Sequence, residues 1–259
     1  MKPLVLTLLA AAAVTGAAQA AEPLTQDPHA VLRAMSGKLA ASKEFSFTAV
    51  REIDAALSHS GDLPEKAKVT LHVSRPGRLA ARSVTSGRTM RLVADGTTLT
   101  LLNETQNHYA QVPVPATIDA LIDRLEAEYG FVPPLADFAV SNPEKEMLRH
   151  ARTVKYLGTT TLRTGFLGLG RLECHRIGLS GPIADAELLI SKKDNLPRQL
   201  TATFRQAGEG AAPALRVTFL QWKLDSPAPA GTFTFTPPSG ADRIEMWTSA
   251  RMRAAAANN

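Results

Sequence analysis

The stretch "VADGTTLTLLNETQNHYAQVPVP" (residues 93–115) decides the fold, because it carries the signals of consecutive antiparallel strands. Asp95-Gly96 separates two strand-like runs, and this dipeptide is a strong signal for a two-residue hairpin turn, whose backbone needs positive φ angles. Leu99 and Leu101 point to one face of the expected strand, and the threonines between them point to the other. The stretch therefore predicts a meander with one apolar face.

The same alternation extends outward in both directions. Upstream, Phe45 and Phe47 are separated by Ser46, and apolar residues stand at every second position from Val69 to Val73. These are patterns of half-buried strands. Downstream, the expected strands are 153–163, 171–179, 185–191, 197–205 and 214–224, with Phe233 and Phe235 marking a last short strand before two prolines.

Three segments have helical periodicity instead. One begins at Asp27-Pro28 and runs to about Ser42, one covers Thr117–Tyr129, and a short one begins at Asn142-Pro143 and ends near His150. A sheet with one apolar face must be covered, and amphipathic helices can cover it. The sequence therefore predicts an α+β fold, a strongly curved antiparallel β-sheet (incomplete barrel) with helices packed in its concave face.

The N-terminus has the pattern of a secretory signal peptide. Lys2 precedes a short apolar run, and Ala18-Gln19-Ala20 is an A-x-A site, so cleavage after Ala20 is expected. The predicted organisation is a signal peptide at 1–20, a single curved-sheet domain at 21–242 and a C-terminal tail at 243–259, either a frayed helix or disordered. The predicted location is the periplasm, and no later stretch is apolar enough for a transmembrane segment.

Composition narrows the function classes. The net charge is +5, and losing Lys2 leaves +4, with the cations scattered rather than clustered, so no nucleic-acid partner is expected. Cys174 is the single cysteine, which rules out an internal disulfide in an oxidising compartment. No cofactor-binding motif was recognised, and the sequence leaves the oligomeric state undetermined.

Catalytic signals are weak. Cys174 and His175 are neighbours on a predicted strand, so their side chains point to opposite faces and cannot share a proton. His108 and Tyr109 have the same problem, and Glu104 stands in a loop. None of the histidines has a metal-ligand spacing to another. We therefore expect no catalytic residue, no metal site and no enzyme; a hydrolase would need a Ser, a His and an acid to converge from distant segments.

Several segments together resemble a known family. They are "LVADGTTLTLLNETQNHYAQVPVPATIDALIDRL" (92–125), "YGFVPPLADF" (129–138), "LECHRIGLS" (172–180), "LLISKKDNLPRQLTATF" (188–204) and "FTFTPPSGA" (233–241). In their order they resemble the predicted periplasmic proteins of domain-of-unknown-function family 2092. More distantly, the strand and loop arrangement at 188–200 is similar to the lipoprotein carriers LolA and LolB, which implies a curved sheet around an apolar cavity for acyl chains.

These observations predict a non-enzymatic periplasmic protein whose partner is a lipid, an acyl chain or a lipoprotein anchor held in an apolar cavity. The alternative is a protein-interaction or envelope-sensing module, with an exposed apolar patch or a free sheet edge. Inward apolar side chains on the strands would suit a filled core as well as a cavity, and their alternation in the sequence does not distinguish the two. The expected ligand-binding side chains are Phe45, Phe47, Leu71, Leu92, Leu99, Leu101 and Tyr109.

Overall fold

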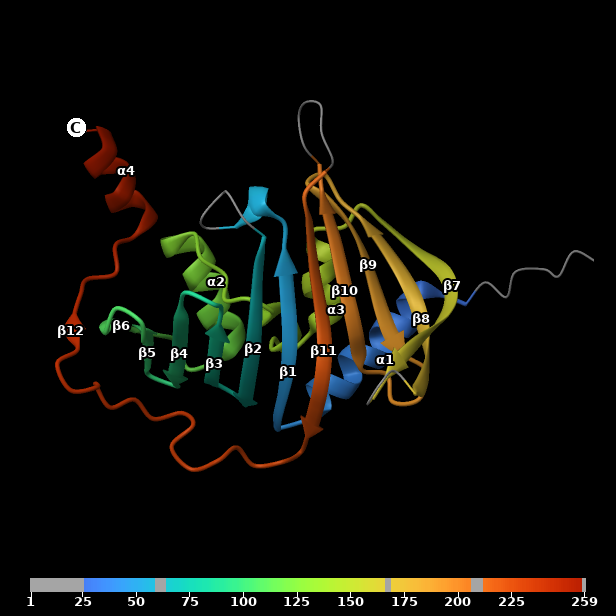
Figure 1. Cartoon of the computed structure of the whole chain (residues 1–259), viewed down its shortest axis with the longest axis horizontal. Coiled ribbons are helices and arrows are strands. Elements are labelled where there is room, and N and C mark those ends of the chain that lie inside the picture. The colour runs from blue at the N-terminus through green and yellow to red at the C-terminus, as the bar shows by residue number, and fades with distance from the viewer. Residues whose placement is uncertain (1–25, 59–63, 166–168, 206–211, 258–259) are drawn as a thin grey trace, which may run out of the picture.

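The computed structural model describes residues 26–58, 64–165, 169–205 and 212–257. They form one twelve-stranded sheet in the order β12-β6-β5-β4-β3-β2-β1-β11-β10-β9-β8-β7, seen from its convex side in Figure 1. The strands are β1 (Glu44–Ile53), β2 (Glu65–Ser74), β3 (Arg78–Val84), β4 (Thr89–Asp95), β5 (Thr98–Asn103), β6 (His108–Pro113), β7 (Thr153–Thr164), β8 (Gly170–Ser180), β9 (Ala184–Ser191), β10 (Pro197–Phe204), β11 (Ala214–Leu224) and β12 (Asp242–Arg243).

The sheet consists of two antiparallel arms that meet at β1. One arm is the meander from β1 to β6, and the other runs from β7 to β11, which returns to pair with β1. The predicted β4–β5 hairpin is present, but only Gly96 has a positive φ, of 102°. Asp95 contributes differently from our expectation: its carboxylate accepts hydrogen bonds from the backbone N–H groups of Thr97 and Thr98, both at 2.8 Å.

The three predicted helices are α1 (Pro28–Ala41), α2 (Ile118–Tyr129) and α3 (Pro143–Arg149). Each begins with a side-chain cap that satisfies a free backbone N–H group: Asp27 accepts from His29, Thr117 from Ala120 and Asn142 from Lys145. Two short 3-10 helices, η1 (Ala55–Leu57) and η2 (Ala136–Phe138), lie in the connections. No helix in the described part of the chain is both long and apolar enough to cross a bilayer.

The core lies between the concave face of the sheet and the helices. Leu32, Met35 and Leu39 of α1 and Leu121 and Leu125 of α2 are at most 1% exposed and pack in one cluster with the inward side chains of the strands. The fold class predicted from the sequence, a strongly curved antiparallel sheet with helices in its concave face, is therefore confirmed.

The chain after β11 forms a strap rather than the predicted last strand at Phe233 and Phe235. This C-terminal strap, residues 226–248, passes along the sheet to the outer edge of β6, where β12 pairs in parallel (Figure 1). A helix, α4 (Ser249–Ala257), follows it, so the predicted tail begins in the strap and continues as a helix. The domain limits stay a prediction, and the predicted signal peptide lies outside the described residues.

Candidate functional site

A pocket of about 200 Å³ lies between the concave face of the sheet and the connector that follows α2. Its floor is apolar and comes from neighbouring strands: Val69 of β2, Met90 and Leu92 of β4, and Leu101 of β5. Phe131, Pro133 and Pro134 of the connector line the opposite side. Because proline has no N–H group, the Pro133-Pro134 pair can face an apolar space without leaving a donor unsatisfied.

The connector is held in place by the end of α2. Gly130 adopts the left-handed conformation with φ 61°, which a side chain would disfavour. Its N–H group donates to the Glu126 carbonyl at 3.0 Å, and the N–H group of Phe131 donates to the Leu125 carbonyl at 3.2 Å. This paired C-cap turns the chain back over the sheet and delivers Phe131 to the pocket.

The space itself results from small side chains in β3. Across the strands, Leu71, Ala81, Leu92 and Leu101 form one inward row, because each is the cross-strand partner of the next. Ala81, and Ser83 two residues further along the same face, leave room where the rest of the row is filled by leucine. The pocket is therefore a consequence of side-chain size and not of a break in the sheet.

An ion pair stands at one end of this apolar surface. Arg51 points to the concave face, and its Nη2 donates to Glu65 Oε1 at 2.6 Å, with the two side chains only 15% and 17% exposed. The buried Nε of Arg51 has no hydrogen-bond partner within the part of the chain that is described.

A second arginine lines the pocket from the turn between β3 and β4. The backbone of Arg88 closes that turn with Thr85, while its guanidinium makes no hydrogen bond or ion pair to the described residues. Arg88 places positive charge beside the apolar floor, whereas Glu65 compensates the charge of Arg51. This combination suits a ligand with an apolar part and an anionic or polar end.

The predicted binding residues separate into three groups. Leu92 and Leu101 line the pocket, whereas Phe45, Phe47, Leu71 and Leu99 are at most 2% exposed and belong to the packed core. Tyr109 lies on the convex face, since its cross-strand partner is Leu102 and not Leu101, and its ring contacts Phe235 at 5.2 Å between centroids. The structure thus brings two of the seven to the pocket, and their binding role stays a prediction.

Sequence reasoning missed the other residues that line the pocket, which are Arg51, Val69, Ala81, Ser83, Arg88, Met90, Arg91, Phe131, Pro133 and Pro134. The position of Arg51 could have been predicted from the sequence. It continues the inward alternation of Phe45, Phe47 and Ala49 in β1, and this alternation places its charge on the apolar face. The connector had no such signal, because an irregular segment has no period that predicts which residues face the sheet.

The Cys174 and His175 side chains have separate environments. Burial raises the pKa of the Cys174 thiol, whose Sγ lies 3.7 Å from the Leu172 carbonyl oxygen. Burial and the charge of Lys192 lower the pKa of His175, whose Nδ1 lies 3.1 Å from Tyr156 Oη. A thiol with a raised pKa is a poor nucleophile at neutral pH. Within the described residues, no three His, Cys, Asp or Glu side chains gather as a metal site requires.

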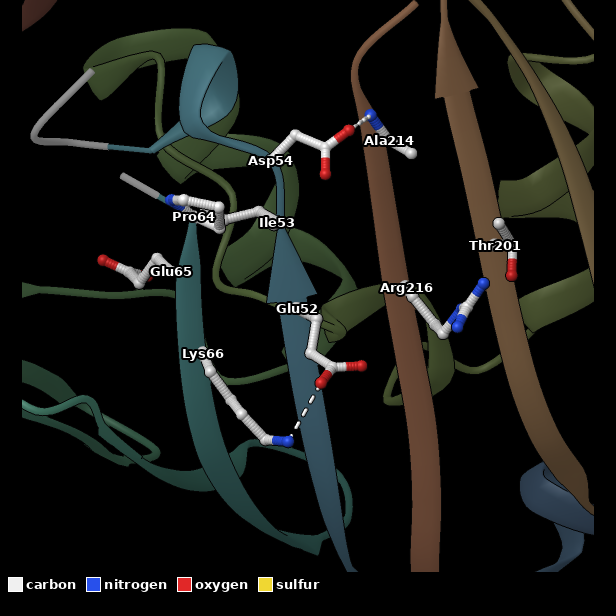
Figure 2. Close-up of a pocket in the computed structure, with 9 residues that line it drawn as sticks. All are labelled: Glu52, Ile53, Asp54, Pro64, Glu65, Lys66, Thr201, Ala214 and Arg216. Carbon is white, nitrogen blue, oxygen red and sulfur yellow. Dashed lines mark hydrogen bonds and ion pairs between the residues drawn. The ribbon is translucent and has the colours of Figure 1, made fainter. Parts of the chain in front are cut away.

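The convex face carries charged side chains instead of an apolar floor. A hollow of about 310 Å³ lies there. Figure 2 shows Lys66, Glu52 and Arg216 of its lining in a row across β2, β1 and β11. Lys66 Nζ lies 2.9 Å from Glu52 Oε1, while the Arg216 side chain extends away from Glu52 toward Thr201 (Figure 2). Asp54 at the rim accepts a hydrogen bond from the Ala214 N–H group at 2.7 Å. This hollow is largely neutralised internally.

Fold and pocket together define a class of protein: one open, strongly curved antiparallel sheet with helices and an apolar pocket on its concave side. A family model described as "Predicted periplasmic protein (DUF2092)" matches residues 29–247. The match covers most of the chain, so this chain belongs to that family, and the expected family is confirmed. Among curated proteins, no sequence matches this chain.

Solved structures with a similar arrangement come from several bacteria. A chain of the MucA/MucB complex of Pseudomonas aeruginosa is 13% identical, with a TM-score of 0.43 over 82% of this chain and 62% of that one. LprF from Mycobacterium bovis is 10% identical, with a TM-score of 0.41 over 83% and 97%. A LolA superfamily protein from Nitrosomonas europaea is 9% identical, with a TM-score of 0.33 over 81% and 98%. This chain thus spans about three fifths of the MucA/MucB chain it matches.

Proposed function

We propose that this protein is a non-enzymatic periplasmic binding protein that holds the apolar end of a lipid or acyl chain in the concave pocket. The observation that carries the proposal is the pocket of about 200 Å³ beside the apolar side chains of Val69, Leu92 and Leu101, bordered by Arg51 and Arg88. An aliphatic end would replace water over this floor, and a carboxylate or phosphate at the other end would lie near the arginines.

The size of the pocket limits what it can hold. A cavity of roughly 150 Å³ is sufficient for a benzene ring, so a pocket of about 200 Å³ accommodates on the order of six to eight carbon atoms. Burying six CH₂ groups would contribute about 5 kcal/mol before ordering costs. The proposal is therefore the capture of one end of a chain, with the rest outside the pocket.

Filling the pocket tests this proposal directly. We would titrate 11-(dansylamino)undecanoic acid into the purified protein and follow the dansyl fluorescence. Met90→Trp places a large side chain in the pocket and should weaken binding at least about tenfold, because the ring occupies the space of the ligand. Leu220→Trp is the matched control, since Leu220 is 58% exposed and does not line the pocket.

Two results would count against lipid binding. One is equal affinity in the Met90→Trp variant and the original protein. The other is the absence of any lipid in organic extracts of protein purified from its own compartment, measured by mass spectrometry, together with no dansyl signal.

A second candidate, protein interaction, is favoured by one feature of the sheet. β7 is an edge strand of 12 residues that pairs only with β8 among the described residues. The segment 152–164 contains Arg152, Lys155 and Arg163 and no acidic residue, so an acidic extended segment of a partner could pair with it. Retention of a partner from periplasmic extract that is lost in Arg163→Glu but kept in Met90→Trp would favour this candidate over lipid binding.

A further inference from the structure

A different hollow lies on the convex face, between the sheet and the C-terminal strap. Its volume is about 340 Å³, and it extends over β2, β3 and β4, with Thr232 of the strap at its border. None of the described residues that line it is acidic. Its polar lining consists of Lys68, Thr70, His72, Arg82, Arg91 and Thr232.

The strand register concentrates positive charge in this hollow. Arg82 of β3 and Arg91 of β4 are directly opposite each other, and Arg82 is also opposite Thr70 of β2. Lys68 stands two residues before Thr70 and so shares the same face. Like charges directly opposite each other in a sheet destabilise it, so this arrangement has a cost that a bound anion would reduce.

The protein itself compensates only one of these three cations fully. Glu104 accepts from the Arg82 guanidinium at 2.7 Å, and this contact raises the pKa of Arg82. Arg91 donates to a single neutral acceptor, the Thr234 carbonyl, at 3.2 Å. The Lys68 ammonium has no ion pair within the described ranges of the chain. Burial and the charge of Lys223 lower the pKa of His72, which agrees with a positive potential at this surface.

The strap forms one wall of the hollow and is anchored on either side of it. The Arg78 guanidinium lies over the Phe233 ring at 5.0 Å, and the Phe235 ring contacts Tyr109 at 5.2 Å. Thr232 and the Thr234 carbonyl are thereby held against the cations of the sheet. A ligand in the hollow would contact both the sheet and the strap.

We propose that this convex hollow binds a phosphate group, with Lys68 and Arg91 as its charged donors and Arg82 as a third when Glu104 releases it. Phosphate suits the site because its oxygens accept several hydrogen bonds at once, from guanidinium, ammonium and hydroxyl groups. Thr70 and Thr232 supply hydroxyl donors, and the volume is in the range of small-molecule sites. The phosphate could belong to a soluble compound or to a lipid headgroup.

The first test is a calorimetric titration of the full chain with inorganic pyrophosphate. Arg91→Gln and Lys68→Gln should each weaken binding about tenfold, because each removes a charge-assisted hydrogen bond. Glu104→Gln should strengthen binding severalfold, because it frees Arg82 from its competing carboxylate. Lys38→Gln removes the same charge from an exposed position of α1, outside the hollow, and should change the affinity less than about twofold.

The opposite directions of these changes make the proposal easy to overturn. The proposal would be overturned if the protein bound neither pyrophosphate nor anionic vesicles in a saturable way. An equal loss of affinity in Lys38→Gln would also overturn it, as would unchanged or weaker binding in Glu104→Gln. Thermal unfolding of each variant shows whether a loss of affinity reflects a loss of fold.

A second arm distinguishes the source of the phosphate. Sedimentation with phosphatidylglycerol vesicles, compared with phosphatidylcholine vesicles, measures headgroup binding. If the protein binds phosphatidylglycerol vesicles and this binding is weaker in Arg91→Gln and Lys68→Gln, the site is assigned to a lipid headgroup. Pyrophosphate binding without vesicle binding assigns it to a soluble phosphate compound, and vesicle binding that neither variant reduces, without pyrophosphate binding, would overturn the proposal.

Discussion

Two neighbouring regions of the concave face lie on adjacent strands of the same sheet and are filled in different ways. Around Phe47, aromatic rings contact each other directly. The centroid of the Phe47 ring lies 4.7 Å from that of Trp222 and 5.2 Å from that of Phe219, and the Phe219 and Phe138 centroids are 5.0 Å apart. Two strands away, around Ala81, a pocket of about 200 Å³ is left. We call these the aromatic region and the pocket region.

The difference between the two regions arises from side chains in both layers. In the aromatic region, Phe138 of η2 reaches the sheet from the helical layer and is fully buried. In the pocket region the same connector presents Pro133 and Pro134, opposite the small Ala81 and Ser83. The backbone ladder is regular from β2 to β4 in the pocket region, whereas the β1–β11 ladder of the aromatic region has a register shift between Thr48 and Ala49. One sheet therefore supports a filled core and an open space side by side, and in the pocket region, where the ladder is regular, side-chain size leaves the space.

The comparison predicts its largest effect at Phe47. Phe47→Ala should lower the free energy of unfolding by about 3–5 kcal/mol, because it removes a fully buried ring and leaves a cavity beside two other aromatic side chains. Urea denaturation followed by circular dichroism measures this change.

Leu101→Ala in the pocket region is the matched variant. Its side chain is only partly buried and already borders an empty space, so the expected loss is about 1 kcal/mol, less than for a buried leucine. Similar losses for the two variants would show that the pocket region is packed as tightly as the aromatic region, and the distinction would have to be abandoned.

Much of this layout could be predicted from the sequence, for identifiable reasons. Strands β7 to β11 were predicted to within a residue or two, because their alternation is regular and loop residues separate them. Asp27-Pro28 and Asn142-Pro143 predicted the starts of α1 and α3 by their capping pattern. The same reasoning gave a wrong prediction for the strap. Phe233 and Phe235 alternate as in a strand, yet they form no strand, and their side chains contact Arg78 and Tyr109 on the convex face.

The candidate site was predicted less completely. Alternation correctly placed Leu92 and Leu101 on the inner face, but it could not separate them from the filled positions Phe45 and Leu71. That distinction depends on which residue of the helical layer lies opposite each position. Tyr109 was assigned to the wrong face, since the register of β5 and β6 pairs it with Leu102.

The second largest effect is expected at the ion pair that borders the pocket region. Glu65→Ala leaves the Arg51 guanidinium without its carboxylate, and a cation that is only 15% exposed then has no compensation. We expect a loss of about 2–3 kcal/mol at pH 7, below the loss for a completely buried pair since both side chains keep some contact with water. Chemical denaturation measures it.

The paired variant Arg51→Met with Glu65→Leu provides the control for this prediction. Replacing both charges with apolar side chains should restore most of the stability, because no charge stays buried without a partner. If the double variant were as unstable as Glu65→Ala, the cost would come from lost packing and not from the unpaired charge.

The smallest effect is expected at Asp137, in the connector that covers both regions. Burial raises the pKa of this carboxyl, and the negative charges of Glu146 and Glu126 act in the same direction, against His150 and Arg149. An acid whose pKa is higher in the folded state binds protons more tightly there. Its contribution to stability therefore falls as the pH rises from its usual pKa of 3.8 through the folded value, and the penalty is complete above that value.

Asp137→Asn removes the ionisation while keeping nearly the same shape. The variant should be more stable than the original protein at pH 7, and this advantage should shrink as the pH is lowered toward 3.8, where the original carboxyl becomes protonated. Thermal unfolding over a pH series measures both. Asp123→Asn, an exposed carboxylate of α2 beside the same Arg149, should change the stability by less than about 0.5 kcal/mol. A stabilisation by Asp137→Asn that stayed constant down to low pH would mean that side-chain shape, and not the buried charge, limits how firmly this connector closes over the sheet.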